Sequence, residues 1–139
     1  LGDQVNLGSR LEGLNKMYGT EIILGESTAR LVGSSFLLRE LDMVRVVGRK
    51  QPLRIYELVG KPDDSLPEER KQSLQYFAAG LEAYRRQLWE DAIALFNQSL
   101  AVWPGDAPSR IMAERCRIFE VECPPGDWDC VFEHISKGK

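Results

Sequence analysis

A short proline-containing linker is the feature that most constrains how this chain of 139 residues can fold. Residues 61–67 read Lys-Pro-Asp-Asp-Ser-Leu-Pro, and two prolines with consecutive acidic residues disfavour both a helix and a strand. The hydrophobic pattern changes across this linker, because short apolar runs precede it and helical repeats follow it. We therefore expect two regions, residues 1–60 and residues 68–139, with different secondary structure.

The region before the linker predicts a mixture of helices and strands. Apolar residues recur at helical spacing in its first part, and Gly19 is suited to end that helix. Two later apolar segments flank a turn-forming sequence, which predicts an antiparallel hairpin. The fold class of this region is therefore α+β. The expected elements are a helix at 4–18, a strand at 21–24, a helix at 27–32 and strands at 36–47 and 53–58.

The region after the linker predicts a small all-α arrangement, a helical hairpin followed by a capping helix. Three segments place apolar residues on one face at helical spacing, over residues 68–86, 89–102 and 107–120. Asp106 stands where the third helix begins and is suited to cap its N-terminus. The segment 127–132 is too short for its pattern to assign an element.

Charge and composition exclude several classes of protein. Residues 1–60 hold 8 Lys and Arg against 7 Asp and Glu, and residues 61–139 hold 10 against 14. Neither region has the basic excess of a nucleic-acid surface, so we expect no nucleic-acid partner. No apolar run approaches the roughly 18 residues that a transmembrane helix needs. No metal site is expected either, because the spacing of Cys116, Cys123 and Cys130 fits no zinc pattern.

The first region opens with Gly2-Asp3-Gln4-Val5-Asn6-Leu7-Gly8-Ser9-Arg10-Leu11-Glu12. This block resembles a stretch in the C-terminal part of the catalytic domain of class III adenylate and guanylate cyclases, and the resemblance covers residues 1–60 in the family's order. Its later blocks are Tyr18-Gly19-Thr20, Ser27-Thr28, Arg39-Glu40-Leu41-Asp42, Val44-Arg45-Val46-Val47-Gly48-Arg49 and Pro52-Leu53-Arg54-Ile55-Tyr56-Glu57-Leu58. It implies part of an enzyme that converts ATP or GTP to a 3′,5′-cyclic nucleotide and pyrophosphate.

Two residues carry the chemistry that this resemblance implies. Asn6 matches the family position that holds the ribose, and Arg10 matches the position that contacts the α-phosphate. A spacing of four places both side chains on one face of a helix, about one turn apart. Arginine suits a phosphorus that gathers negative charge in the transition state, because its fork of donors stays charged.

The chain departs from the family at one phosphate-binding position. Many relatives have a lysine there that binds the triphosphate, and this chain has Val47. Arg49 or Lys50, in the same turn, could supply part of the missing charge, so Arg49 is a candidate nucleotide-binding residue. The alternative is that both are solvated residues of the turn.

The resemblance also implies partners that this chain does not supply. The family's two metal-binding aspartates, which hold Mg²⁺ or Mn²⁺, come from segments upstream of Leu1, so we expect this chain alone to be inactive. Catalytic sites of the family form between two catalytic domains, which implies a homodimer. The alternative function is a non-catalytic regulatory or interaction module, made of a degenerate cyclase half and the helical tail.

The second region resembles one tetratricopeptide repeat, with Gly80, Ala92, Phe96 and Pro104 at the repeat's small, aromatic and terminal positions. A single repeat offers little concave surface, so an appendage that packs on the cyclase half is favoured over a tail that binds a protein partner. Bacterial cyclases with a membrane anchor often end in a similar tail. The resemblance thus implies the cytoplasmic domain of a bacterial protein that reaches the membrane only through its N-terminal segments.

Overall fold

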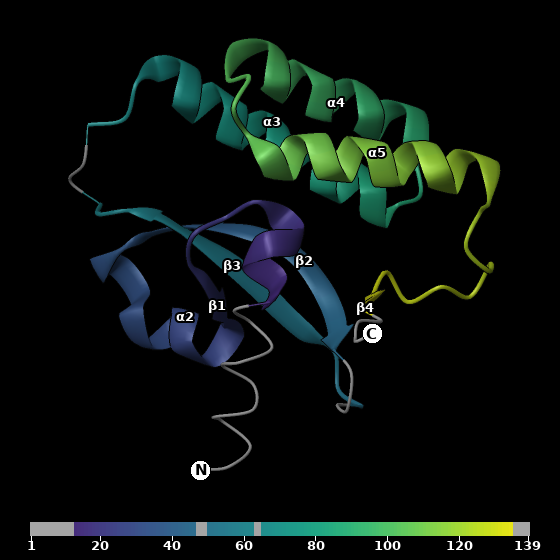
Figure 1. Ribbon diagram of the computed structural model, residues 1–139, viewed down its shortest axis with the longest axis horizontal. Helices are drawn as coiled ribbons and strands as arrows, with labels where there is room; N and C mark the ends of the chain where they lie inside the picture. The colour runs from purple at the N-terminus through teal and green to yellow at the C-terminus, as the bar shows by residue number, and fades with distance from the viewer. Residues whose placement is uncertain (1–12, 47–49, 63–64, 135–139) are drawn as a thin grey trace. The chain divides into compact units, whose positions relative to one another are not determined.

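The computed structural model of the protein describes residues 13–46, 50–62 and 65–134, and Figure 1 shows them as a ribbon. The chain falls into two compact units. The sheet unit contains the described residues up to 62 together with residues 129–134, and the helical unit contains residues 65–128. The chain therefore leaves the sheet unit, builds the helical unit and then returns to the sheet unit.

The sheet unit combines helices with one sheet of mixed direction, which confirms the predicted α+β class. Strand β3 pairs antiparallel with both β1 and β2, and β4 pairs parallel with β2, so the order is β1-β3-β2-β4. Residues 13–18 are helical as predicted. The other elements are β1 (Ile23–Gly25), α2 (Glu26–Val32), the 3-10 helix η1 (Gly33–Ser35), β2 (Leu37–Val46), β3 (Leu53–Gly60) and β4 (Phe132–His134).

The end of the first helix and a bulge in the hairpin shape this unit. Gly19 has φ of +69°, a left-handed conformation in which glycine carries no Cβ strain, so the helix ends where the sequence predicted. The pairing of β2 with β3 shifts register between Glu40 and Asp42. Because such a bulge breaks strict alternation, the consecutive residues Leu41 and Asp42 are both fully buried. The apolar core of the unit contains Leu14, Tyr18, Ile23, Ala29, Leu41, Val44, Ile55 and Val131.

The helical unit consists of α3 (Glu68–Arg85), α4 (Trp89–Val102) and α5 (Ala107–Val121), which confirms the three predicted helices. The carboxylate of Asp106 accepts a hydrogen bond from the backbone N–H of Ser109, so the predicted N-cap of α5 is also confirmed. The buried apolar side chains come from all three helices: Phe77, Leu81, Ala83, Tyr84, Ala92, Phe96, Met112, Ala113 and Cys116.

Close approach of α3 and α4 requires a glycine. A Cβ built at Gly80 would lie 2.7 Å from Cε1 of Phe96, closer than van der Waals contact allows. The Phe96 ring is fully buried and packs against Phe77 with ring centroids 5.3 Å apart, so it has little room to retreat. The missing side chain at Gly80 thus sets how near the two helices lie.

The structure adds one element that the sequence pattern did not reveal. Residues 129–134 were expected to belong to the helical tail, whereas the structure groups them with the sheet unit and forms β4 from three of them. A strand of three residues is too short to show a hydrophobic period, and its pairing with β2 is a contact between distant parts of the chain. No helix within the described residues is long and apolar enough to cross a bilayer.

Candidate functional site

The three residues with predicted roles, Asn6, Arg10 and Arg49, lie outside the residues that the structure describes, as does Val47. The described residues that adjoin them are the helical segment 13–18, the end of β2 and the start of β3. The described residues that could position the candidate site are those that fix the helix, those that fix the hairpin and the charged residues near the turn.

A buried hydrogen bond fixes the helical segment 13–18 to the sheet. The phenol of Tyr18 donates to Oδ2 of Asp42 over 2.6 Å, and both side chains are fully buried. The second carboxylate oxygen, Oδ1, accepts from the backbone N–H of Met43 over 2.8 Å. A buried carboxylate left without donors would be costly, so this pair ties the helix to β2 at one point.

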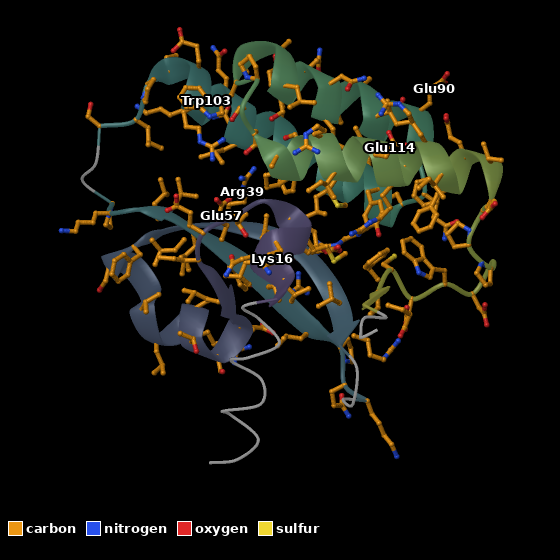
Figure 2. All side chains as sticks on the ribbon, viewed as in Figure 1. Lys16, Arg39, Glu57, Glu90, Trp103 and Glu114 are labelled. Atoms are coloured by element: carbon orange, nitrogen blue, oxygen red, sulfur yellow. The ribbon has the colours of Figure 1, made fainter. Side chains whose placement is uncertain are left out.

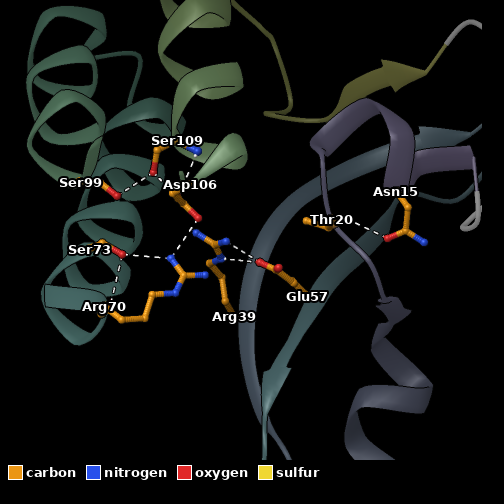
Figure 3. A network of polar contacts seen from close by, with 9 residues as sticks. All are labelled: Asn15, Thr20, Arg39, Glu57, Arg70, Ser73, Ser99, Asp106 and Ser109. Carbon is orange, nitrogen blue, oxygen red and sulfur yellow. Dashed lines mark hydrogen bonds and ion pairs between the residues drawn. The ribbon is translucent and has the colours of Figure 1, made fainter. Parts of the chain in front are cut away.

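Two ion pairs cross the hairpin between β2 and β3. The first joins Arg39 to Glu57, which are directly opposite in the register, and the Arg39 Nε lies 2.9 Å from the Glu57 Oε1. Figure 2 labels this pair on neighbouring strands, and Figure 3 shows it from close by. The Arg39 side chain is only 4% exposed, so loss of Glu57 would leave a buried charge without this carboxylate. The second pair joins Arg54 to Glu40 and is more open to solvent.

Electrostatics near the hairpin raise the pKa of two side chains. Burial raises the pKa of Tyr56 above its usual value, and the negative charge of Glu40 raises it further. Like an ordinary tyrosine, Tyr56 is protonated at neutral pH and can donate a hydrogen bond. Burial lowers the pKa of the Arg54 guanidinium, but the hydrogen bond and charge attraction to Glu40 together raise it more.

The end of β2 carries an arginine that is held by the C-terminal segment. The Arg45 guanidinium donates to Glu133 and to Asp129, the latter over 3.2 Å, and its Nε donates to the backbone oxygen of Lys50 over 3.0 Å. The hydrogen bonds that the Arg45 guanidinium donates to Asp129 and Glu133 raise its pKa. The resemblance gave Arg45 no role, and the signal that could have drawn attention to it is its place two residues before Val47.

The metal ligands that the resemblance implies have no counterpart in the described chain. Residues 13–46, 50–62 and 65–134 contain no group of three His, Cys, Asp or Glu side chains that could hold a metal ion. Two acidic side chains of the C-terminal segment, Asp129 and Glu133, both pair with Arg45. These residues do not fit a magnesium site, so no catalytic step is assigned to a metal held by them.

The helical unit has its own shallow groove, formed by α3 and α4. It encloses about 520 Å³ and is lined by small, apolar and charged side chains: Ala79, Glu82, Ala83, Arg86, Leu88, Asp91, Ala94, Leu95 and Gln98. A groove so open and so mixed in charge has the character of a packing surface rather than of a small-molecule pocket.

Three known proteins similar to this chain are named as adenylate cyclases. An adenylate cyclase of Dictyostelium discoideum that is specific to terminal differentiation is 32% identical over 119 residues, which is 84% of this chain and 6% of that protein. An adenylate cyclase of Anabaena cylindrica is 44% identical over 61 residues, covering 42% of this chain and 12% of that protein. Adenylate cyclase 1 of Rhizobium meliloti is 40% identical over 60 residues, covering 43% of this chain and 9% of that protein.

The chain contains a region related to adenylate cyclases. It spans only about a tenth or less of the length of these relatives. A match to 84% of the chain cannot be contained in residues 1–60, so the similarity to the Dictyostelium protein extends from the cyclase-related region into the helical unit. No family model and no solved structure matches the chain.

Proposed function

We propose that this chain is the C-terminal end of an adenylate cyclase catalytic domain together with a helical tail. The observation that carries the proposal is that three adenylate cyclases match the chain, one of them over 84% of its length. The ordered motifs in residues 1–60 point the same way. Because all three relatives are named as adenylate cyclases, ATP is favoured over GTP as the substrate of the intact enzyme.

The proposed reaction joins the ribose 3′-oxygen of ATP to its α-phosphorus. The 3′-hydroxyl loses its proton, the new O–P bond forms and the bond to the β-phosphate breaks, which releases pyrophosphate. Asn6 would orient the ribose, and Arg10 would donate to the α-phosphate oxygens as negative charge gathers there. Mg²⁺ or Mn²⁺, held by aspartates upstream of this chain, would supply charge neutralisation at the phosphates.

The described residues would support this chemistry by positioning it. The Tyr18–Asp42 hydrogen bond holds the end of the helix that, by its sequence pattern, extends back to Arg10 and Asn6. The buried Arg39–Glu57 pair fixes the register of the hairpin whose turn contains Arg49. A displacement of about 1 Å at a catalytic group can cost about a hundredfold in rate, so such supports matter to the activity.

The remaining parts of the proposal concern assembly. Two catalytic domains would form each site, so the intact protein is proposed to be a homodimer, and the present chain alone is proposed to be inactive. The helical unit is proposed to be a tetratricopeptide-like appendage, with a protein partner as the alternative. The intact protein is proposed to be a bacterial one, anchored to the membrane by segments upstream of this chain.

The test compares this chain with a protein extended upstream through both metal-binding aspartates. We expect the extended protein to form cyclic AMP from ATP with Mg²⁺ or Mn²⁺, and the 139-residue chain to form none. Arg10→Ala in the extended protein should lower kcat by about a hundredfold to a thousandfold, as for the loss of one donor to a developing charge.

The matched control is Arg30→Ala, because Arg30 is an exposed arginine of α2 that pairs with Glu26 within the same helix. It should leave kcat unchanged. An extended protein that makes no cyclic AMP, or that loses nothing with Arg10→Ala, would contradict the proposal. ATP binding without turnover would instead favour the regulatory module.

A further inference from the structure

A segment from the C-terminus lies along the edge of β2. After the helical unit, the chain returns at Asp129 and forms β4, which pairs parallel with the last residues of β2. The register places Val44 beside Phe132 and Arg45 beside Glu133. Figure 1 shows β4 in yellow next to the end of β2. We call residues 129–134 the C-terminal strap.

In addition to the backbone pairing, two side chains of the strap bind one cationic side chain of β2, Arg45. Of the donors on the Arg45 guanidinium, Nη1 bonds to the Glu133 carboxylate, and Nη2 lies 3.2 Å from Oδ2 of Asp129. Both acids are more than 80 residues away in sequence, so local geometry does not impose the contact. The backbone N–H of Val131 donates to Oδ1 of Asp129 over 3.1 Å and so holds this carboxylate in place.

The position of Arg45 relates it to the phosphate-binding turn. Arg45 stands two residues before position 47 in the sequence, near the end of β2. Its Nε bonds to the backbone oxygen of Lys50, on the far side of the same turn. Arg45 is therefore a cation at the turn where the charge of the family's lysine is missing.

The chemistry of the guanidinium allows a second ligand. Its planar fork of donors binds carboxylates and phosphates with the same geometry. The Arg45 side chain keeps 28% of its surface exposed while it holds both acids, so an anion in solution can reach it. Surface ion pairs of this kind are weak, so a multiply charged phosphate can compete for the arginine.

We propose that Arg45 is a triphosphate-binding residue, and that Asp129 and Glu133 of the C-terminal strap compete with the triphosphate for it. The inference rests on the proposed function, because that function supplies a nucleoside triphosphate at this turn. The strap is then an internal inhibitor: two carboxylates neutralise the cation in the absence of nucleotide and give it up when the phosphates arrive. Arg45 replaces in part the charge that is lost at Val47.

The experiment titrates inorganic triphosphate into the 139-residue chain, without divalent ions and at constant ionic strength, and follows the Arg45 Nε–H and the Glu133 amide by NMR. Both signals should shift along one saturable curve. Neutralising the strap with Asp129→Asn plus Glu133→Gln should tighten binding by about fivefold to tenfold, as expected for two exposed charge pairs. Arg45→Gln should weaken binding by about the same factor and remove the effect of the strap substitutions.

The matched control is Arg54→Gln, because Arg54 is a partly exposed arginine of the same sheet that pairs with Glu40 and not with the strap. It should leave the affinity within about twofold. Equal affinity in the wild-type and strap-neutral chains, wild-type affinity in Arg45→Gln, or no saturable binding would each overturn the proposal. If a variant fails to fold, the wild-type shifts at Arg45 and Glu133 still decide, since triphosphate binding elsewhere would leave them unmoved.

This experiment is independent of the proposed function, because it measures binding in this chain and not turnover. If triphosphate competes with the strap but the extended protein makes no cyclic AMP, the proposed function fails and the anion site at Arg45 stands. If the extended protein makes cyclic AMP while triphosphate ignores Arg45, the inference fails and the proposed function stands.

Discussion

The two units of this protein both have an apolar core, but they differ in which side-chain contacts join their elements. In the helical unit, four aromatic rings from Tyr84, Trp89, Phe119 and Trp128 pack with centroid distances between 5.2 and 6.3 Å. In the sheet unit, several of the side-chain contacts between elements are polar: the Tyr18–Asp42 bond and the pairs of Arg39, Arg45 and Arg54.

The difference indicates which kind of contact determines the positions of side chains in each unit. Apolar packing depends on filled volume and little on direction, so we expect the helical unit to be sensitive to the size of its buried side chains, as at Gly80 and Phe96. A buried polar pair depends on distance and angle, so the sheet unit holds specific side chains in specific places. The second property is the one that the proposed cyclase site would need.

The helical unit also contains polar contacts between its helices, and one group of them lies near the start of α5. Arg70 of α3 lies 3.1 Å from the Asp106 carboxylate that caps α5, and the hydroxyls of Ser109 and Ser99 share a hydrogen bond of 2.7 Å. Figure 3 shows these bonds together. They fix where α5 begins relative to α3 and α4, and the packing of apolar side chains does the rest.

The largest expected effect is the loss of an aromatic ring from the helical core. Phe96→Ala should lower the free energy of unfolding of the helical unit by about 3–5 kcal/mol, because it removes a fully buried ring and leaves a cavity. Amide hydrogen exchange of α3, α4 and α5 in the intact chain measures it. Val121→Ala is the control, since Val121 is 84% exposed and should cost less than about 0.5 kcal/mol. Similar costs for the two variants would show that apolar packing does not dominate this unit.

Close helix approach predicts a smaller loss in the same unit. Gly80→Ala should lower the free energy of unfolding by about 1–3 kcal/mol, because the new Cβ would overlap the buried ring of Phe96. Gly105→Ala is the control, since a Cβ there meets nothing within 4 Å and the substitution should not cause a steric clash. Exchange rates of α4 amides compare the two. A stabilised Gly80→Ala chain would mean that the ring can move aside, and the glycine would then not set the helix spacing.

Sequence reasoning predicted the local elements of both units, including the antiparallel hairpin of β2 and β3, but not the long-range contacts of the sheet unit. The helices of the helical unit follow from the period of their apolar residues, and Asp106 follows from its place before Pro108, so local sequence was sufficient. The contacts that shape the sheet unit join residues 24 apart at Tyr18 and Asp42 and 88 apart at Arg45 and Glu133. No local pattern encodes such pairs, and β4 was missed for this reason. The site residues Asn6, Arg10 and Arg49 come from the resemblance alone and stay predictions.

A single hydroxyl tests the polar character of the sheet unit. Tyr18→Phe should lower the free energy of unfolding by about 1–2 kcal/mol, because the buried Asp42 carboxylate loses a donor while the ring is kept. Exchange of the β2 and β3 amides should accelerate while that of α4 stays constant. The control is Tyr56→Phe on β3, whose half-buried phenol should cost less than about 0.5 kcal/mol. Equal effects on both units, or none, would remove the distinction between them.

The smallest effect concerns the C-terminal strap at low pH. The backbone N–H of Val131 lowers the pKa of Asp129, partial burial opposes this, and Arg45 lowers it further, so the pKa lies below the ordinary 3.8. A carboxyl whose pKa is lower in the folded state stabilises the fold at every pH above its pKa in the unfolded state. That contribution is lost as the pH falls through its pKa in the folded state. The amide signal of Val131 should therefore hold constant down to about pH 4 and shift below it. Asp129→Asn should remove the shift, and a midpoint above 3.8 in the unmodified chain would show that Asp129 is not held in this way.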